Sequence, residues 1–574
     1  MSLISNKFEF KRVWWILLIL IISGFFLRFY EFRWGLPGLY VSDTQIISEA
    51  ADMGNALLQK NWDFFAEPVK YPFIIPYLLL FANGVFFVLG MIGGIFSSVA
   101  DFSKFISLHQ EIPFLIARFF SILAGTAIIP LTFFTARLLA KRFGCAKPDF
   151  AAVISSFFAA FSLLLFQFSR LEKSHVIVGF FTLLSYFLYL RFIERPSRKN
   201  GFWLGVVAGL AAGTLHNGVL AALFLILPLL FFLFKKRNFL DYRFICWGLL
   251  SAAILIFLSY PFFFLSPLDA LKPGADFGIN FDISLSGGKH NVSSFGGLGF
   301  YTIFQKFLFY DPAIFVLTII SIIFLGSARK RFARFLKADA FGILAYSIVF
   351  LLVFGLFDST SGRFLTPLIL LMIVMSGVVL SEVLRRRLGI IFLSLLCLFS
   401  FTQVLRMAYL IGLPDTRALA TQWVGEHLTG EDVLLINAQN IATPLTKESI
   451  LWNTELGGPD TRRDELLLSL PDEDYPKDAK NILRSWQLEI ADYQEFTEKN
   501  NINYILVSLD KKRDSSDPLL IFAEKNFKLK EVFSPSNKHP DFLSPSFPDE
   551  FSSPIIDLWR IERMGPEIRI YSKP

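Results

Sequence analysis

The amino-acid sequence predicts a mainly α-helical, polytopic membrane protein with about 11–13 transmembrane helices and a C-terminal extracytoplasmic α/β domain. Of its 574 residues, 54% are hydrophobic and only 18% are charged, whereas soluble domains carry about one quarter charged residues. Apolar segments alternate with short basic runs as far as residue 411, and charged residues become frequent after it. We therefore expect a membrane domain over 1–411 and an outer domain over 412–574.

The expected membrane spans follow from length, since a hydrocarbon core of about 30 Å needs about 20 apolar residues in a helix. Segments that approach this length lie at 13–31, 112–138, 150–168, 175–192, 202–216, 218–234, 244–264, 307–326, 339–357, 364–382 and 388–410. No small-residue cleavage site follows the first segment, so it is expected to be a transmembrane helix rather than a signal peptide. Arg28, Tyr30 and Trp34 are expected to anchor its end at the membrane interface.

Basic runs predict the orientation of these spans. They fall in every second loop, at 141–147, 195–199, 235–237, 329–331 and 385–387. Because positively charged loops stay on the cytoplasmic side, we expect a multi-pass protein of the cell (plasma or inner) membrane with a cytoplasmic N-terminus. The outer loops would then be 32–111, 169–174, a turn near 217, 265–306 and 358–363, with the tail also outside.

One apolar stretch, Phe73–Phe96, does not fit this alternation. It contains Pro76 and glycines at 84, 90, 93 and 94. A single crossing would place every later basic run outside, and the stretch is too short for two full crossings. We expect a re-entrant or interfacial hairpin, or two short tilted spans.

The tail after residue 411 has the pattern of a small α/β domain. An amphipathic helix is expected in DTRALATQWVGEHL, with Ala418, Trp423, Val424 and Leu428 on its apolar side. DVLLINA and INYILVSL are typical of buried strands, EIRIYS of a closing strand and PLLIFAEKNF of a helix.

The first long polar segment, 34–76, carries the strongest candidate for chemistry, Asp43. It stands at the start of an expected amphipathic helix that has Ile46, Ala50, Met53 and Leu57 on one face. Asp43 can act as a helix cap, since Ser42 and Gln45 fit a capping box. It can also act as a general base that takes a proton from an acceptor hydroxyl. The two roles are compatible, because a carboxylate at a helix start is well fixed.

Lys70 closes the same loop. It can be an interfacial lysine whose charged head reaches the membrane surface, or a cation placed where a lipid phosphate would lie.

The second informative loop is Ser169–His175, SRLEKSH, between two apolar spans. Ionisable residues at membrane depth cost about 2.5–3.5 kcal/mol each, so they usually have partners or a ligand. One reading is a local ion pair of Glu172 with Arg170 or Lys173. The other is that Arg170, Lys173 and His175 bind a phosphate while Glu172 assists Asp43.

Further polar groups are expected on the same outer side. They are Arg118, His216, Asn217 and Arg363. The Gly- and Ser-rich loop 265–306 has the composition of a mobile lid, and His290 within it is more often incidental than catalytic. The three cysteines, at 145, 246 and 397, lack metal-ligand spacing and imply no disulfide framework. The small formal charge of +7 and its clustering in loops exclude a nucleic-acid partner.

These residues resemble the GT-C superfamily of membrane glycosyltransferases, in the branch of dolichyl-phosphate-mannose protein mannosyltransferases and lipid A aminoarabinose transferases. The matching segments, in order, are GLPGLYVSDTQIISEAADMG, KYPFIIPYLL, ARFFSILAGTAIIPLTFFTARLLAKRFG, FSRLEKSHVIVGFF, GLAAGTLHNG and GRFLTPLILL. They extend over most of residues 10–410, and their order is more specific than any one of them.

The resemblance implies that Asp43 is the catalytic base and that Lys70 and Arg363 lie near the phosphate of a lipid-linked donor. Two departures stand out: Thr44 replaces a second acid that is common in the family, and His175 replaces a usual Asp. They weaken the case for a carboxylate-bound metal. No metal ligand is assigned and no cofactor is certain, and a divalent cation stays open.

The expected function is transfer of a sugar, with inversion, from a polyprenyl-phosphate donor to a protein, lipid or glycan acceptor outside the membrane. The alternative is a polytopic transporter or flippase for a lipid-linked or anionic substrate, which would show inverted repeats and broken helices. A third reading, an anchored binding protein, needs far fewer spans. The sequence does not identify the sugar or the acceptor.

Overall fold

A computed structural model describes most of the chain. The described residues are 2–40, 44–67, 71–235, 240–270, 296–327, 329–336, 340–357, 360–383, 387–438, 440–457, 462–488, 490–510, 517–539, 541–545, 551 and 553–574. They form two compact units, the first made of residues 1–32, 43–84 and 116–405, the second of 33–42, 85–115 and 406–574. The expected domain boundary at 411/412 stays a prediction.

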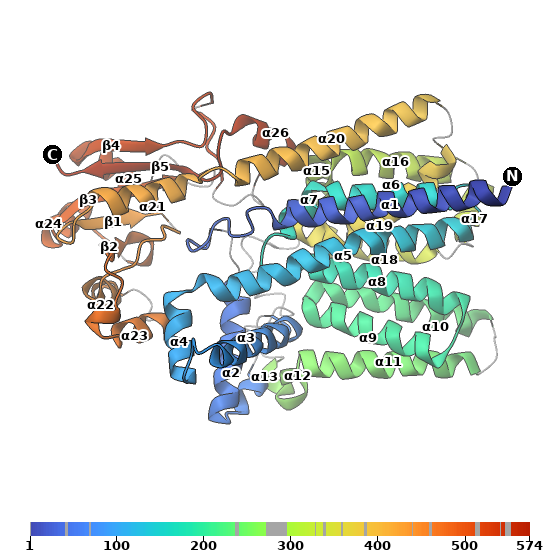
Figure 1. The fold of residues 1–574 in the computed structure, drawn as a ribbon, viewed down its shortest axis with the longest axis horizontal. Coiled ribbons are helices and arrows are strands. Elements are labelled where there is room, and N and C mark those ends of the chain that lie inside the picture. The colour runs from blue at the N-terminus through green and yellow to red at the C-terminus, as the bar shows by residue number, and fades with distance from the viewer. Residues whose placement is uncertain are drawn as a thin grey trace. The chain divides into compact units, whose positions relative to one another are not determined.

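The first unit is helical (Figure 1). Its elements are α1 (Ser2–Phe29), α2 (Thr44–Gln59), η1 (Asp63–Ala66), α3 (Ile74–Ile92), α5 (Glu111–Phe143), α6 (Pro148–Phe161), α7 (Leu163–Phe168), α8 (His175–Glu194), α9 (Arg198–Thr214), η2 (His216–Ala222), α10 (Leu223–Lys235), α11 (Leu240–Ser259), α12 (Phe262–Leu265), α13 (Pro267–Ala270), α15 (Gly299–Tyr310), α16 (Pro312–Gly326), α17 (Arg329–Phe335), α18 (Phe341–Gly355), η4 (Gly362–Leu365), α19 (Thr366–Val383) and α20 (Arg387–Ile411). The mainly helical fold class is thus as predicted.

Helix α19 forms the centre of this unit. It packs against α6, α8, α16 and α18, and 94% of its most apolar stretch is buried inside the protein. Most of α1 and α20, by contrast, exposes apolar side chains such as Phe26 and Leu398. Apolar surface of this extent is expected where helices face lipid.

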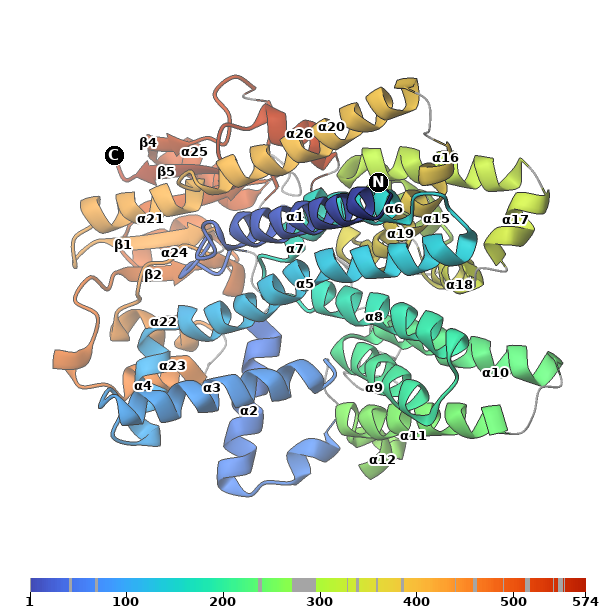
Figure 2. The same cartoon turned by 45° about the vertical axis from the view of Figure 1, so that its right-hand side comes forward.

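Small residues allow α9 and α11 to approach closely, and both views show them side by side (Figures 1 and 2). Gly201 and Gly205 of α9 face the carbonyl oxygens of Phe244 and Gly248, and a Cβ at either glycine would lie only 2.0 and 1.9 Å from them. Such spacing of small residues is a common way to pack transmembrane helices.

Six helices among the described residues are long and apolar enough to cross a membrane, or seven if the bent pair α15–α16 is one span. Four shorter apolar helices accompany them, and the chain is a multi-pass membrane protein. The expected number of 11–13 transmembrane helices stays a prediction. It would require some of the shorter or broken helices to cross the membrane as well. Two expected spans are broken: 150–168 divides into α6 and α7 at Ser162, and α16 follows α15 at a bend of 118°.

The sequence analysis expected Phe73–Phe96 to form a hairpin or two short spans, and this prediction is wrong. The stretch contains one continuous helix, α3, over Ile74–Ile92. Pro76 lies in the first turn of this helix, where its missing N–H costs no intrahelical hydrogen bond. Gly94 has φ +70° and follows the helix end, which is the usual place for a left-handed residue.

The second unit contains a mixed sheet of five strands in the order β2-β1-β3-β5-β4. Its elements are α4 (Val99–Leu108), α21 (Thr416–His427), β1 (Val433–Asn437), α22 (Lys447–Glu455), α23 (Arg462–Leu468), η5 (Asp472–Asp474), β2 (Asn481–Arg484), η6 (Ser485–Gln487), α24 (Tyr493–Lys499), β3 (Ile502–Leu509), α25 (Pro518–Asn526), β4 (Lys528–Phe533), α26 (Pro554–Arg560) and β5 (Glu567–Ser572). Strands β2, β1 and β3 are parallel, and β5 runs antiparallel to β3 and β4.

The predicted α/β character of the tail is confirmed. The expected strands are β1, β3 and β5, and the expected helices are α21 and α25. The sheet has a core on both faces, with Leu435 and Ile505 on one and Leu434 and Leu506 on the other. The sequence analysis missed β2, which has only four residues, and β4, whose residues are mostly exposed and therefore lack an apolar pattern.

A buried ion pair stands at the start of α21. Arg417 donates to both carboxylate oxygens of Asp415, with both distances 2.8 Å. Its guanidinium lies 4.0 Å from the ring centre of Tyr40, and one N–H reaches the Tyr40 carbonyl at 3.4 Å. The second unit thus includes residues 33–42, which follow α1, as well as the tail.

Candidate functional site

The predicted polar loop Ser169–His175 connects α7 to α8 and is buried along its whole length. Residues that carry formal charge are rarely buried without partners. The partners of this loop therefore decide whether it is a structural cluster or a binding site.

Glu172 is paired with Arg118 of α5. The Nε of Arg118 donates to Oε2 of Glu172 at 2.8 Å, and the two side chains are 1% and 0% exposed. A second Arg118 nitrogen donates to the carbonyl of Phe32 at 2.9 Å. Glu172 thus pairs with a cation from another helix, a partner that the sequence analysis did not consider.

Arg28 is fully buried, and its expected role as an interface anchor is wrong. It donates to the Ser169 hydroxyl at 3.2 Å, and to the carbonyls of Gly24, Ala159 and Ala160 at 3.0–3.2 Å. These bonds join α1 and α6 to the first residue of the loop. The sequence predicted an anchor because Arg28 lies at the end of an apolar span. It could not predict the contact with Ser169, because the two residues are 141 positions apart in the chain.

Arg170 is held by backbone carbonyls at the end of α1. One terminal nitrogen donates to Tyr30 and, at 2.8 Å, to Glu31, while its Nε and other terminal nitrogen have no partner in the part of the chain that the structure describes. Burial, with repulsion from Arg118, lowers the pKa of the Arg170 guanidinium to about 9. Arg170 therefore keeps its charge at neutral pH.

Three of the predicted phosphate ligands gather at the start of α8. His175 is 3% exposed, and neither ring nitrogen has a partner within the described ranges. Lys173 precedes it by two residues. The ring centre of His175 is 5.2 Å from that of Phe364, the residue that follows Arg363. The N-terminal end of a helix also favours a negative ligand. The two cations, Lys173 and Arg363, together with the helix end, fit an anion.

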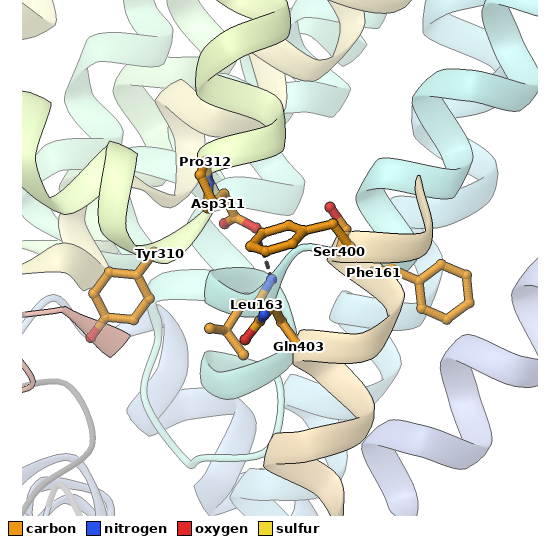
Figure 3. Close-up of a pocket in the computed structure, with 8 residues that line it drawn as sticks. Phe161, Leu163, Tyr310, Asp311, Pro312, Ser400 and Gln403 are labelled. Atoms are coloured by element: carbon orange, nitrogen blue, oxygen red, sulfur yellow. Dashed lines mark hydrogen bonds between the residues drawn. The ribbon is translucent and has the colours of Figure 1, made fainter. Parts of the chain in front are cut away.

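Asp311, which the sequence analysis overlooked, holds the other end of α7. Its carboxylate accepts from the Ser162 hydroxyl at 2.8 Å and from the amides of Leu163 and Leu164 at 2.8 and 3.3 Å. Figure 3 shows this side chain, between Tyr310 and Pro312, directed at Leu163. A lone acidic residue between two apolar segments gave no signal that it would cap a distant helix.

Asp43 and Lys70 lie outside the described residues, as do Ser42 and most of the loop 265–306 with His290. The helix expected after Asp43 is confirmed as α2, with Ile46, Ala50 and Met53 buried. His216 meets the Tyr260 hydroxyl at 3.0 Å. Asn217 is 7% exposed, and neither of its amide atoms has a partner in the described structure.

The described side chains were compared with the ligand sets that hold metal ions. No group of three or more His, Cys, Asp or Glu among them could hold a metal ion.

No protein-family model matches this chain, and no curated protein matches it. Several solved structures, however, are similar to it. The chain is similar to an archaeal oligosaccharyltransferase from Archaeoglobus fulgidus, solved with an inhibitory peptide and a dolichol-phosphate, at 13% identity and a TM-score of 0.46. That match covers 92% of this chain and 74% of the other.

The chain is also similar to ArnT from Cupriavidus metallidurans bound to undecaprenyl phosphate. The identity is 13% and the TM-score 0.46, with 90% of this chain and 96% of the other covered. Both solved proteins belong to the GT-C superfamily. A third match, at 14% identity and a TM-score of 0.43, is to the Archaeoglobus fulgidus enzyme in complex with zinc and sulfate, and covers 91% of this chain and 72% of the other. Likenesses this distant carry no argument about the reaction, so the proposals below rest on the residues of this chain.

Proposed function

We propose that the protein transfers a sugar from a polyprenyl-phosphate donor to an acceptor on the extracytoplasmic face of the membrane. The observation that carries the proposal is the group of His175, Lys173 and Arg363 near the start of α8, in which His175 and Lys173 are buried and Arg363 is partly buried. An anion site at the end of apolar helices suits a ligand that joins a phosphate to an apolar chain. The resemblance of the sequence to GT-C glycosyltransferases gives the same reaction class.

The mechanism is a single displacement that inverts the anomeric carbon. The acceptor hydroxyl oxygen forms the new bond to this carbon, the bond to the phosphate oxygen breaks, and the phosphate keeps the electron pair. Asp43 takes the proton of the hydroxyl. Cations fixed near the phosphate stabilise the charge that grows on it in the transition state.

The remaining predicted ligands have distinct parts in this proposal. Arg170, two of whose nitrogens have no partner among the described residues, and Lys70 add positive charge toward the phosphate. Glu172 forms an ion pair with Arg118. In this proposal Glu172 therefore assists Asp43 indirectly, by holding the loop 169–175 in place. We propose the orientation that the basic runs imply, with the N-terminus in the cytoplasm and the tail domain outside a plasma or inner membrane.

The test is transfer of radiolabelled sugar from polyprenyl-phosphate donors by the purified protein in liposomes. Wild type is compared with Asp43→Asn and with the control Asp52→Asn, which changes an exposed carboxylate on α2. A general base contributes about 10²- to 10⁴-fold, so Asp43→Asn should lose transfer by that factor while the control does not. Equal transfer by all three proteins would remove Asp43 from the chemistry and leave it as a helix cap.

A second candidate function, transport of a lipid-linked or anionic substrate, is favoured by the two broken helix pairs α6–α7 and α15–α16. Broken helices with polar groups at the break are common in secondary transporters. Movement of labelled donor lipid between leaflets of a sealed liposome, without sugar transfer, would support this candidate and contradict the first.

A further inference from the structure

Two helix breaks meet at one side chain in the first unit. The break between α6 and α7 lies at Ser162, and the break between α15 and α16 lies at Asp311. The carboxylate of Asp311 is 3% exposed and accepts three hydrogen bonds, all from the first break. The amides at a helix start have no intrahelical partner, and here a carboxylate 147–148 residues away in the chain satisfies two of them, those of Leu163 and Leu164.

Helix α7 carries this attachment to the candidate phosphate site. It has only six residues, Leu163–Phe168, all of them buried, and it ends at Ser169, the first residue of the polar loop. Arg28 holds that end through the Ser169 hydroxyl. A helix of fewer than two turns has little stability of its own, so its direction depends on what fixes its two ends.

The same junction contacts the element that carries Arg363. Gly362, the first residue of η4, packs against the ring of Tyr310 and the side chain of Leu164, where an added Cβ would lie 2.9 and 3.5 Å from them. Tyr310 directly precedes Asp311, and Leu164 belongs to α7. The packing thus connects the backbone at Asp311 with both halves of the cationic group, the loop 169–175 and Arg363.

We propose that Asp311 is a positioning residue for the donor phosphate: it fixes α7 and, through α7 and η4, sets Lys173 and His175 opposite Arg363. This inference rests on the proposed function. Asp311 touches no substrate in it. Bonds to an ionised acceptor are shorter and stronger than bonds to a neutral one, which suits a residue that must hold a short helix in one orientation.

The first measurement is the KM for the donor and the KM for the acceptor. Both are determined with folded protein of Asp311→Ala, Asp311→Asn and wild type. The control is Asp149→Ala, which makes the same change at the other end of α6, where Asp149 pairs with Arg137. Misplacement by about 1 Å can cost about 100-fold, so Asp311→Ala should raise the donor KM by about 10- to 100-fold and leave the acceptor KM unchanged. Asp311→Asn, which keeps an acceptor oxygen, should fall between. Unchanged donor KM in Asp311→Ala would overturn the inference.

The second measurement needs no activity. Amide hydrogen exchange over 163–175 is compared in wild type, Asp311→Ala and Asp149→Ala. Faster exchange in Asp311→Ala alone supports the inference, and equal exchange in all three proteins overturns it. A wild type that neither transfers sugar nor binds polyprenyl phosphate would defeat the proposed function, while the exchange result would still decide whether Asp311 fixes the loop.

Discussion

The Nε of Arg118 and the carboxylate of Glu172 lie 2.8 Å apart, with both side chains withdrawn from solvent. Arg118 comes from the long helix α5 and Glu172 from the loop between α7 and α8. Arg118 also donates to the carbonyl of Phe32. The pair therefore ties the polar loop to α5 and to the segment that follows α1.

Loss of Glu172 should destabilise the protein before it affects any chemistry. Glu172→Leu leaves the Arg118 charge buried without its carboxylate, and breaking a buried pair in this way costs about 3–5 kcal/mol. Thermal unfolding of the purified protein in detergent should show a clearly lowered midpoint. A midpoint equal to that of wild type would mean that the pair contributes no stability.

The double variant Arg118→Met/Glu172→Leu separates stability from function. Replacing both partners by apolar side chains is often neutral, so the unfolding midpoint should return toward that of wild type. Recovered transfer in this folded protein would show that Glu172 serves only to hold the loop. Transfer that stays lost would support its part in assisting Asp43.

His175→Phe should weaken donor binding without unfolding the protein, since the ring already packs against Phe364. Loss of a hydrogen bond to a charged group costs about 1.5–3 kcal/mol, so the donor KM should rise by about 10- to 150-fold. The control is His109→Phe, in which the replaced side chain is 50% exposed. Equal KM values in the two variants would remove His175 from the phosphate site.

Arg417→Met should destabilise the second unit. It leaves the Asp415 carboxylate, 2% exposed, without its cation, at a cost of about 3–5 kcal/mol. Arg569→Met removes a guanidinium that is 31% exposed, and such pairs are worth about 0–1 kcal/mol. Chemical unfolding followed by intrinsic fluorescence compares the two, and an Arg417→Met as stable as Arg569→Met contradicts the expectation.

Gly205→Val should force α9 and α11 apart. The Cβ it adds would meet the Gly248 carbonyl oxygen at 1.9 Å, and backbone cannot move aside as a side chain can. Overpacking typically costs about 1–3 kcal/mol. Gly84→Val is the matched control, because a Cβ on Gly84 meets no atom within 4 Å. The unfolding midpoint should fall in the first variant only.

The sequence by itself determined the class of the protein and much of its element order. Apolar length and basic loops are local properties of the chain, so the helical membrane domain, the amphipathic helix α2 and the tail strands β1, β3 and β5 follow from them. The polar loop Ser169–His175 was also visible, because charged residues interrupt an apolar pattern there.

The tertiary structure alone decided what each charge in that pattern meets. Glu172 meets Arg118 across 54 residues of chain, and Arg28 meets Ser169 across 141. The helix break at Ser162 is completed by Asp311, 149 residues away. Local propensity has no information on such partners, because the burial that makes an unpaired charge costly exists only after the helices have packed. The fold therefore selects which carboxylate caps a helix and which cations lie at the candidate phosphate site.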